Sequence, residues 1–169
     1  MTQDDRGVDL ETSLGYLLKE ASSALRADME AVLRPLGMTV THYSCLELLA
    51  QRPGLSNSEL ARGAFVTRQS MNVLLQALEQ DGFVTRPAEA SIGKVLPARL
   101  TARGRRSLAT ASAAVRSVEL RMLSGMTPAE QSGARAALQS MIRSLQGSGA
   151  RSGSAKAARA ASELSNSGE

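Results

Sequence analysis

Two helix-start signals lie eleven residues apart in the middle of the chain, which leaves room for only a short helix and a turn between them. Ser56 and Glu59 form a capping-box pair, in which the Ser side chain caps the helix and the Glu three residues later reaches back. Thr67 is a second N-cap candidate. The spacing therefore predicts a short helix over 57–62 and a longer one over 68–80.

The segment between these helices, Gly63-Ala64-Phe65-Val66, provides the predicted turn. The second helix is expected to end at Asp81-Gly82, because glycine readily adopts the left-handed backbone of a helix stop. Two helices joined by a short turn that contains glycine indicate a helix-turn-helix, whose second helix enters the major groove of DNA.

Four further helices are predicted around this unit. Apolar residues recur at helical spacing from Leu10, and Pro35 and Gly37 stop that helix. The others are expected over 39–51, over 101–124 and from the capping box at 127–130 to about residue 145. The apolar stripes of the first and last helices exceed what one small domain covers, so we expect a partner chain, here a second copy.

Strand-like composition interrupts the helical pattern only between Gly82 and Leu100. Residues 83–86 and 94–100 predict two short strands around a turn-like loop, and Pro97 confines the second strand to an edge or a bulge. The predicted fold class is mainly α with a small β-hairpin wing (α+β): a winged helix-turn-helix with a helical dimerisation region from both chain ends.

The charge is distributed unevenly along the chain. The net charge is +4, yet residues 1–30 carry three basic against seven acidic side chains, and residues 52–106 carry nine basic against four acidic. A basic middle segment suits double-stranded DNA. The sequence shows neither an apolar run long enough to span a bilayer nor a secretory signal, which predicts a cytoplasmic protein without a membrane partner.

The polar face of the helix over 68–80 carries the expected base contacts, since Arg reads guanine and Asn or Gln read adenine. Helix N-termini and the hairpin supply the expected phosphate contacts. The predicted DNA-binding residues are Ser56, Asn57, Arg62, Thr67, Arg68, Gln69, Ser70, Asn72, Gln76, Arg86 and Lys94.

The stretch from Leu60 to Arg86, followed by Leu100-Thr-Ala-Arg-Gly104, resembles the MarR family of bacterial transcription regulators. The resemblance covers residues 10–145. It implies a homodimeric winged-helix protein that binds a pseudo-palindromic operator, acts as a repressor and responds to a small aromatic or lipophilic effector. The family's wing tip carries Asp-x-Arg, whereas Ile92 and Lys94 stand at those positions, so phosphate contact is expected there and minor-groove insertion is left open.

These expectations divide the chain into five parts. Residues 1–9 form a flexible N-terminus, 10–36 a dimerisation helix, and 37–100 the DNA-binding domain. Residues 101–146 add further dimerisation helices. The Gly-, Ser- and Ala-rich stretch over 147–169 is predicted to be disordered, because it buries too little apolar surface.

Three residues invite other hypotheses. His42 and Tyr43 are candidates for an effector pocket, and Cys45, the only cysteine, is a candidate redox switch. His42 and Cys45 alone are too few for a structural zinc site, and no catalytic constellation is evident, so neither a metal, a cofactor nor enzymatic activity is expected. The alternatives that remain are a redox-sensing regulator acting through Cys45, and a dimeric interaction module that has lost specific DNA binding.

Overall fold

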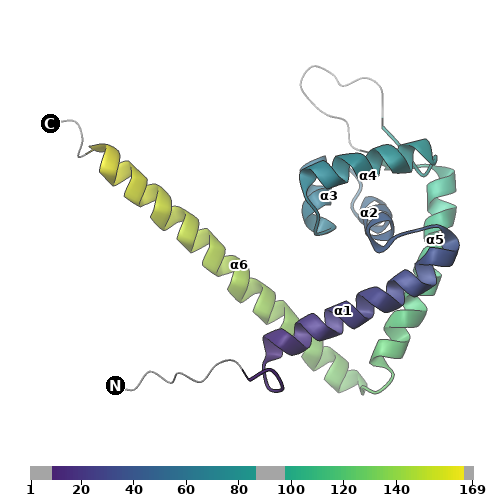
Figure 1. The fold of residues 1–169 in the computed structure, drawn as a ribbon, viewed down its shortest axis with the longest axis horizontal. Helices are drawn as coiled ribbons and strands as arrows, with labels where there is room; N and C mark the ends of the chain where they lie inside the picture. The colour runs from purple at the N-terminus through teal and green to yellow at the C-terminus, as the bar shows by residue number, and fades with distance from the viewer. Residues whose placement is uncertain (1–8, 87–97, 166–169) are drawn as a thin grey trace. The chain divides into compact units, whose positions relative to one another are not determined.

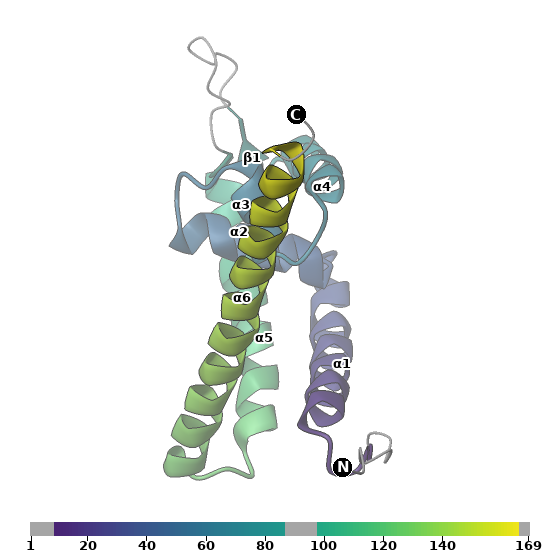
Figure 2. The same ribbon diagram turned by 90° about the vertical axis from the view of Figure 1, so that its left-hand side faces the viewer.

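The computed structural model describes residues 9–86 and 98–165, with side chains up to residue 147. The chain divides into two compact units that meet between Met122 and Leu123. In the first unit, α2 (Val40–Gln51), α3 (Asn57–Gly63) and α4 (Arg68–Gln80) pack together. Two longer helices, α1 (Leu14–Leu33) and α5 (Ala102–Leu123), extend from this group (Figure 1, Figure 2).

Side-chain caps set the helix starts. The Ser13 hydroxyl accepts a hydrogen bond from the Tyr16 N–H, so α1 begins at Leu14 and not at Leu10 as predicted. Ser56 and Thr67 cap α3 and α4 as expected, accepting hydrogen bonds from the N–H groups of Glu59 and Ser70. Each cap satisfies a backbone donor that has no partner inside its helix, which stabilises the helix by about 1 kcal/mol.

The end of α1 follows the sequence prediction. A single 3-10 turn, η1 (Arg34–Leu36), carries Pro35 and leads to Gly37, whose φ of 68° is left-handed. The Met38 N–H then donates to the Leu33 carbonyl over 3.2 Å, which closes the helix end. Leu33 and Met38 thereby enter the core from both sides of the stop.

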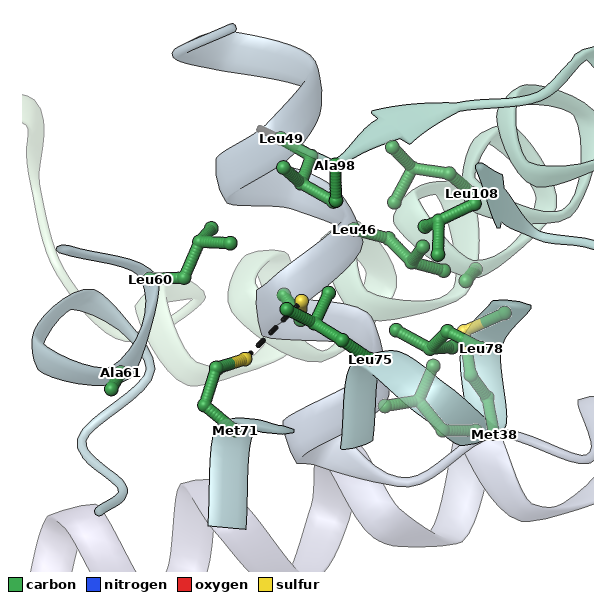
Figure 3. Packing of buried hydrophobic residues seen from close by; sticks show 14 residues of the cluster. Met38, Leu46, Leu49, Leu60, Ala61, Met71, Leu75, Leu78, Ala98 and Leu108 are labelled. Carbon is green, nitrogen blue, oxygen red and sulfur yellow. Dashed lines mark hydrogen bonds between the residues drawn. The ribbon is translucent and has the colours of Figure 1, made fainter. Parts of the chain in front are cut away.

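The core joins one face of α4 to α2, α3, the strands and the start of α5. Met71, Leu75 and Leu78 of α4 point into it, and Figure 3 shows them beside Leu46 and Leu49 of α2. A fully buried Leu or Met side chain contributes about 1.5–3 kcal/mol. The buried cluster comprises Leu33, Met38, Cys45, Leu46, Leu49, Leu60, Ala61, Met71, Leu75, Leu78, Val84, Ala98, Leu108 and Ala111.

The predicted hairpin is present at its base. Strands β1 (Val84–Thr85) and β2 (Arg99–Leu100) pair antiparallel, with Val84 opposite Leu100 and Thr85 opposite Arg99. The strands are shorter than predicted, and residues 87–97, which include Ile92, Lys94 and Pro97, lie outside the described residues.

The Leu-Thr-x-x-Gly motif fastens this hairpin to α5. The Thr101 hydroxyl donates to the Gly82 carbonyl over 2.6 Å and accepts from the Gly104 N–H over 3.0 Å. Gly104 lies so close to Phe83 that an added Cβ would stand 2.0 Å from the Phe83 carbonyl oxygen. Only glycine allows this approach, so the motif is explained by packing and capping.

The second unit contains α6 (Pro128–Ser165). Its start matches the prediction, because the Thr127 hydroxyl donates to Glu130 over 2.8 Å and the Thr127 N–H donates to the same carboxylate over 2.7 Å. The helix continues past residue 146, where a disordered tail was predicted, through a segment rich in alanine, the best helix former. No helix of the described residues combines the length and the apolar character that crossing a membrane requires.

The contact at Gly104 predicts a stability effect. Gly104→Ala is expected to lower the free energy of unfolding by about 3 kcal/mol, because the new methyl group would push the Phe83 backbone out of place. Gly133→Ala on α6 is the matched control, since an added Cβ there meets no atom within 4 Å. Replacing a helical glycine with alanine at that position should stabilise by up to about 1 kcal/mol. Urea unfolding of both variants measures the difference, and equal stabilities would contradict this explanation.

Candidate nucleic-acid interface

The polar face of α4 is exposed as the sequence predicts. Arg68, Gln69, Asn72 and Gln76 are exposed, while Met71, Leu75 and Leu78 on the opposite face are buried. The core therefore fixes one side of α4 and leaves the side with base-reading chemistry open. No ion pair to Arg68 is formed within the described residues, so its guanidinium is available to a ligand.

The turn between α3 and α4 differs from its sequence-based interpretation. Gly63 belongs to α3, and its small size suits the packing of Leu48, whose Cδ1 would stand 2.8 Å from an added Cβ. The left-handed residue of the turn is Phe65, with φ of 57° and a side chain that is 94% exposed. A left-handed backbone costs an ordinary residue roughly 1–2 kcal/mol. Sequence rules that assign such positions to glycine could not find this one.

The predicted phosphate-binding residues have different environments. The Ser56 hydroxyl is committed to the α3 capping box, where it donates to Glu59 over 2.6 Å. This bond holds the pKa of Glu59 below its usual value. At the start of α4 the Thr67 hydroxyl donates to the Ser70 hydroxyl over 2.8 Å, and both residues are exposed. Arg62 is exposed at the end of α3.

Arg86 forms an ion pair that the sequence analysis missed. Its Nε and Nη2 donate to Glu79 Oε2 over 2.8 and 2.6 Å, and its backbone N–H donates to Glu79 Oε1 over 3.2 Å. The bonded guanidinium holds the pKa of Glu79 below its usual value. Arg86 thus ties the end of β1 to α4, and its charge is largely neutralised within the protein.

Asn57 and Asn72 contact each other across the two helices of the motif. The Asn57 Nδ2 donates to Asn72 Oδ1, and Asn57 is partly buried while Asn72 is exposed. The sequence analysis assigned both to DNA separately, and no local pattern signals a pair that is fifteen residues apart.

A cavity of about 320 Å³ lies beside this pair, between the start of α3, α4 and the base of the hairpin. Leucine side chains make its apolar walls, and Arg68 supplies a positive charge. The lining comprises Leu55, Ser56, Asn57, Ser58, Leu60, Arg68, Asn72, Leu75, Arg86 and Ala98.

The two candidate effector-pocket residues lie at the start of α2. His42 completes a capping box: its N–H donates to Thr39 Oγ1 over 3.1 Å, and its Nδ1 accepts from the Thr39 N–H over 3.4 Å. Burial lowers the pKa of His42, against a smaller opposing effect of Asp81. Tyr43 packs against the core, and burial raises its pKa. The structure therefore gives His42 a helix-capping role that sequence reasoning overlooked.

Cys45 lacks the properties that a redox switch needs. Its side chain is fully buried, and its Sγ lies 3.8 Å from Met71 Sδ (Figure 3). Burial raises the pKa of the Cys45 thiol to about 12, so the reactive thiolate is scarce at neutral pH. The structure thus gives no support to the redox hypothesis. No group of three or more His, Cys, Asp or Glu side chains in the described part of the chain is placed to hold a metal ion.

A helix-turn-helix with an exposed polar second helix, followed by a β-hairpin, defines a winged helix-turn-helix protein. The sequence model of the MarR family matches residues 36–91. HTH-type transcriptional repressor Rv2887 of Mycobacterium tuberculosis is 47% identical over 125 residues, which make up 74% of this chain and 90% of that protein. The chain belongs to the MarR family of transcriptional regulators.

Solved structures of a relative agree with this assignment. The crystal structure of the Mycobacterium tuberculosis MarR family protein Rv2887 in complex with DNA has a TM-score of 0.65 and 42% identity, covering 77% of this chain and 98% of that chain. Its complex with salicylic acid also has a TM-score of 0.65, with 43% identity, covering 82% of this chain and 99% of that chain. The winged-helix fold class predicted from the sequence is confirmed.

Burial of Cys45 predicts an inert thiol. Because Cys45 is the only cysteine, alkylation by iodoacetamide at about pH 8 reports on it alone. The folded protein should remain unmodified on a timescale in which the urea-unfolded protein reacts completely, as measured by intact mass. Rapid modification of the folded protein, or loss of DNA binding in mild peroxide that Cys45→Ser prevents, would restore the redox hypothesis.

The capping role of His42 predicts a pH dependence. Since its pKa is lower in the folded protein than its usual 6.5, the unfolded chain binds the proton first as the pH falls. The contribution of His42 to the free energy of unfolding is therefore fully present above pH 6.5. It decreases as the pH falls below 6.5 and through the lower pKa of the folded protein. His42→Gln is the matched control, because Gln at this position can accept the same cap hydrogen bond without titrating. Melting temperatures between about pH 7.5 and pH 5.5 should fall more for the parent than for His42→Gln, and parallel curves would refute the assignment.

Proposed function

We propose that the protein is a homodimeric transcriptional repressor that reads a pseudo-palindromic operator with two copies of α4. The observation that carries this proposal is the exposed polar face of α4, held by a buried face on a helix-turn-helix. In such dimers the two recognition helices enter successive major grooves about one helical turn apart. The crystal structure of its relative Rv2887 in complex with DNA supports the same function. We expect a repressor that acts on DNA in this way to work in the cytoplasm.

The second copy is expected to cover apolar surface that each unit leaves exposed. In the first unit, Leu14 and Leu17 of α1 and Leu120 of α5 are 66%, 43% and 61% exposed. In the second unit, Ile142 and Leu145 on α6 are also exposed. Exposed apolar surface of this extent marks an interaction site. We therefore assign dimerisation to α1, α5 and α6.

Specificity and affinity are expected to come from different residues. Arg68, Gln69, Asn72 and Gln76 face outward on α4 and would contact base edges. Arg62, Thr67 and Ser70 would contact phosphates, together with Lys94, which the sequence assigns to the wing. Because Glu79 neutralises Arg86, we assign Arg86 mainly to holding the hairpin on α4.

Substitution on α4 tests this proposal. Arg68→Ala is expected to weaken binding to the operator by about 1–3 kcal/mol and to relax the preference at one base pair. Arg116→Ala, which removes an exposed arginine of α5 with the same charge change, is the matched control and should leave base preference unchanged. The measurement is fluorescence anisotropy with a duplex from the promoter region of the protein's own gene.

Two results would contradict the proposal. If Arg68→Ala lost affinity equally for every duplex, α4 would not be the reading helix. If the parent bound the promoter duplex no better than a scrambled one, the chain would be an interaction module that has lost specific DNA binding.

We further propose that a small aromatic carboxylate releases the protein from DNA, and that it binds in the cavity beside α4. The crystal structure of the relative Rv2887 in complex with salicylic acid suggests the ligand class. The cavity fits it in chemistry, because leucine walls suit a ring and Arg68 suits a carboxylate. Arg68 and Asn72 line this cavity and also face the proposed DNA, so a ligand there would compete with the operator directly.

Salicylate is therefore expected to lower operator affinity at least tenfold at saturation, which corresponds to about 1.4 kcal/mol. Salicylamide is the control, since it keeps the ring but lacks the charge that Arg68 would bind. Operator anisotropy and melting temperature report release and binding separately. A salicylate effect shared by salicylamide would move the site away from Arg68, and no effect of either would exclude this effector class.

A further inference from the structure

The hydrogen bond between Asn57 and Asn72 determines which chemical groups α4 presents to DNA. Asn57 is the first residue of α3, directly after the Ser56 cap, and Asn72 lies in the second turn of α4. The Asn57 amide nitrogen donates to the Asn72 amide oxygen. Each side chain is held by a helix that the core fixes, so the contact is a rigid link between the two helices of the motif.

The direction of this hydrogen bond follows from comparing the polar groups that the observed and the reversed amide orientations leave unpaired. The Asn57 Oδ1 is buried and has no hydrogen-bond partner within the described residues. If both amides were reversed, the Asn57 NH2 would occupy that buried place and leave two N–H donors unpaired in place of the two lone pairs of one oxygen atom. Buried N–H groups without a partner are rarer in proteins than carbonyl oxygens without one, so the observed direction is the favourable one.

With this direction, the oxygen and the nitrogen of the Asn72 amide have different partners. Its oxygen is engaged by Asn57, and its NH2 group is left for a ligand outside, because Asn72 is exposed. An asparagine that reads adenine presents both groups to the base, the oxygen to N6 and the nitrogen to N7. In this arrangement the Asn72 NH2 group is the part of the amide without a partner in α3, while its oxygen already accepts from Asn57.

We propose that Asn57 is a positioning residue that makes Asn72 a hydrogen-bond donor, so that Asn72 selects an acceptor-rich base edge, guanine N7 and O6, over adenine. The inference rests on the proposed function, in which α4 reads base edges. It replaces the adenine contact that the sequence suggests for Asn72. Arg68, one helical turn before Asn72 on α4, also recognises guanine, so the two side chains favour neighbouring base pairs of the same chemistry.

Two substitutions at Asn57 change the Asn72 amide in different ways. Asn57→Asp leaves only acceptors at this position, so Asn72 must turn its NH2 toward α3 and its oxygen outward. The preference should then move to bases that offer a donor, cytosine N4 or adenine N6. Asn57→Ala removes this hydrogen bond. The ratio of affinities between the preferred base and the others at this base pair should then fall roughly tenfold, and no other base should become preferred. Aspartate is favourable in the first turn of a helix, so Asn57→Asp is expected to fold.

The experiment selects bound sequences from a randomised DNA duplex library with the full-length parent, Asn57→Asp, Asn57→Ala and Asn72→Ala. Affinities for the selected duplex and all its single-base substitutions follow, with melting temperatures for each protein. The base pair at which Asn72→Ala loses preference is the position to compare. The added charge of Asn57→Asp weakens binding to every duplex alike, so the ratio of affinities between bases is the measure. Gln51→Ala, which removes an exposed amide at the end of α2, is the control and should leave this ratio unchanged.

The inference is supported if the parent prefers guanine at that base pair and Asn57→Asp moves the preference as described. It is overturned if the parent prefers adenine there, or if both Asn57 variants scale all affinities by one factor, as a purely structural role would. These results leave the proposed function intact. If Asn72→Ala alters no preference, the reading role of Asn72 fails as well, and the Arg68 measurement then decides whether α4 reads DNA at all.

Discussion

The packing of α4 on α2 is the contact on which the rest of this protein depends. The side chains of Met71, Leu75 and Leu78 on α4 are buried in the same cluster as those of Cys45, Leu46 and Leu49 on α2. Because this face of α4 is buried, the residues on the opposite face of the helix are exposed. The same burial raises the pKa of the Cys45 thiol to about 12, so one interaction both exposes the polar face of α4 and disfavours the reactive thiolate.

Around that contact, short polar links hold the neighbouring elements in register. The Thr101 hydroxyl and Gly104 join the hairpin to α5, and the Arg86–Glu79 ion pair joins it to α4. The Asn57–Asn72 bond joins α3 to α4. Two of these links use residues that sequence reasoning had assigned to DNA. In this winged helix-turn-helix, some polar side chains hold α4 in place and others are exposed to a ligand. Residue type alone does not show which role each side chain has.

The comparison with the sequence expectations is instructive at particular elements. Ser56 and Thr67 cap α3 and α4 where predicted, because a cap is a contact between residues that are close in sequence. The turn between α3 and α4 was predicted to begin at Gly63, whereas Gly63 ends α3 and the left-handed residue of the turn is Phe65, a conformation that local rules reserve for glycine. The end of α6 was predicted too early, since the glycine-rich composition suggested disorder, whereas the alanines of the same segment favour helix.

The sequence by itself determined the starts of α3, α4 and α6, the position of the hairpin, the apolar faces and the membership of the MarR family, because these depend on local hydrogen bonds, periodicity and motif spacing. Only the tertiary structure decided the roles of individual polar residues. Asn57, Arg86 and His42 each have a partner inside the protein, and Cys45 is enclosed by it. The reason is physical: a hydrogen bond or ion pair depends on distance in space, and packing between helices, which periodicity cannot specify, sets that distance.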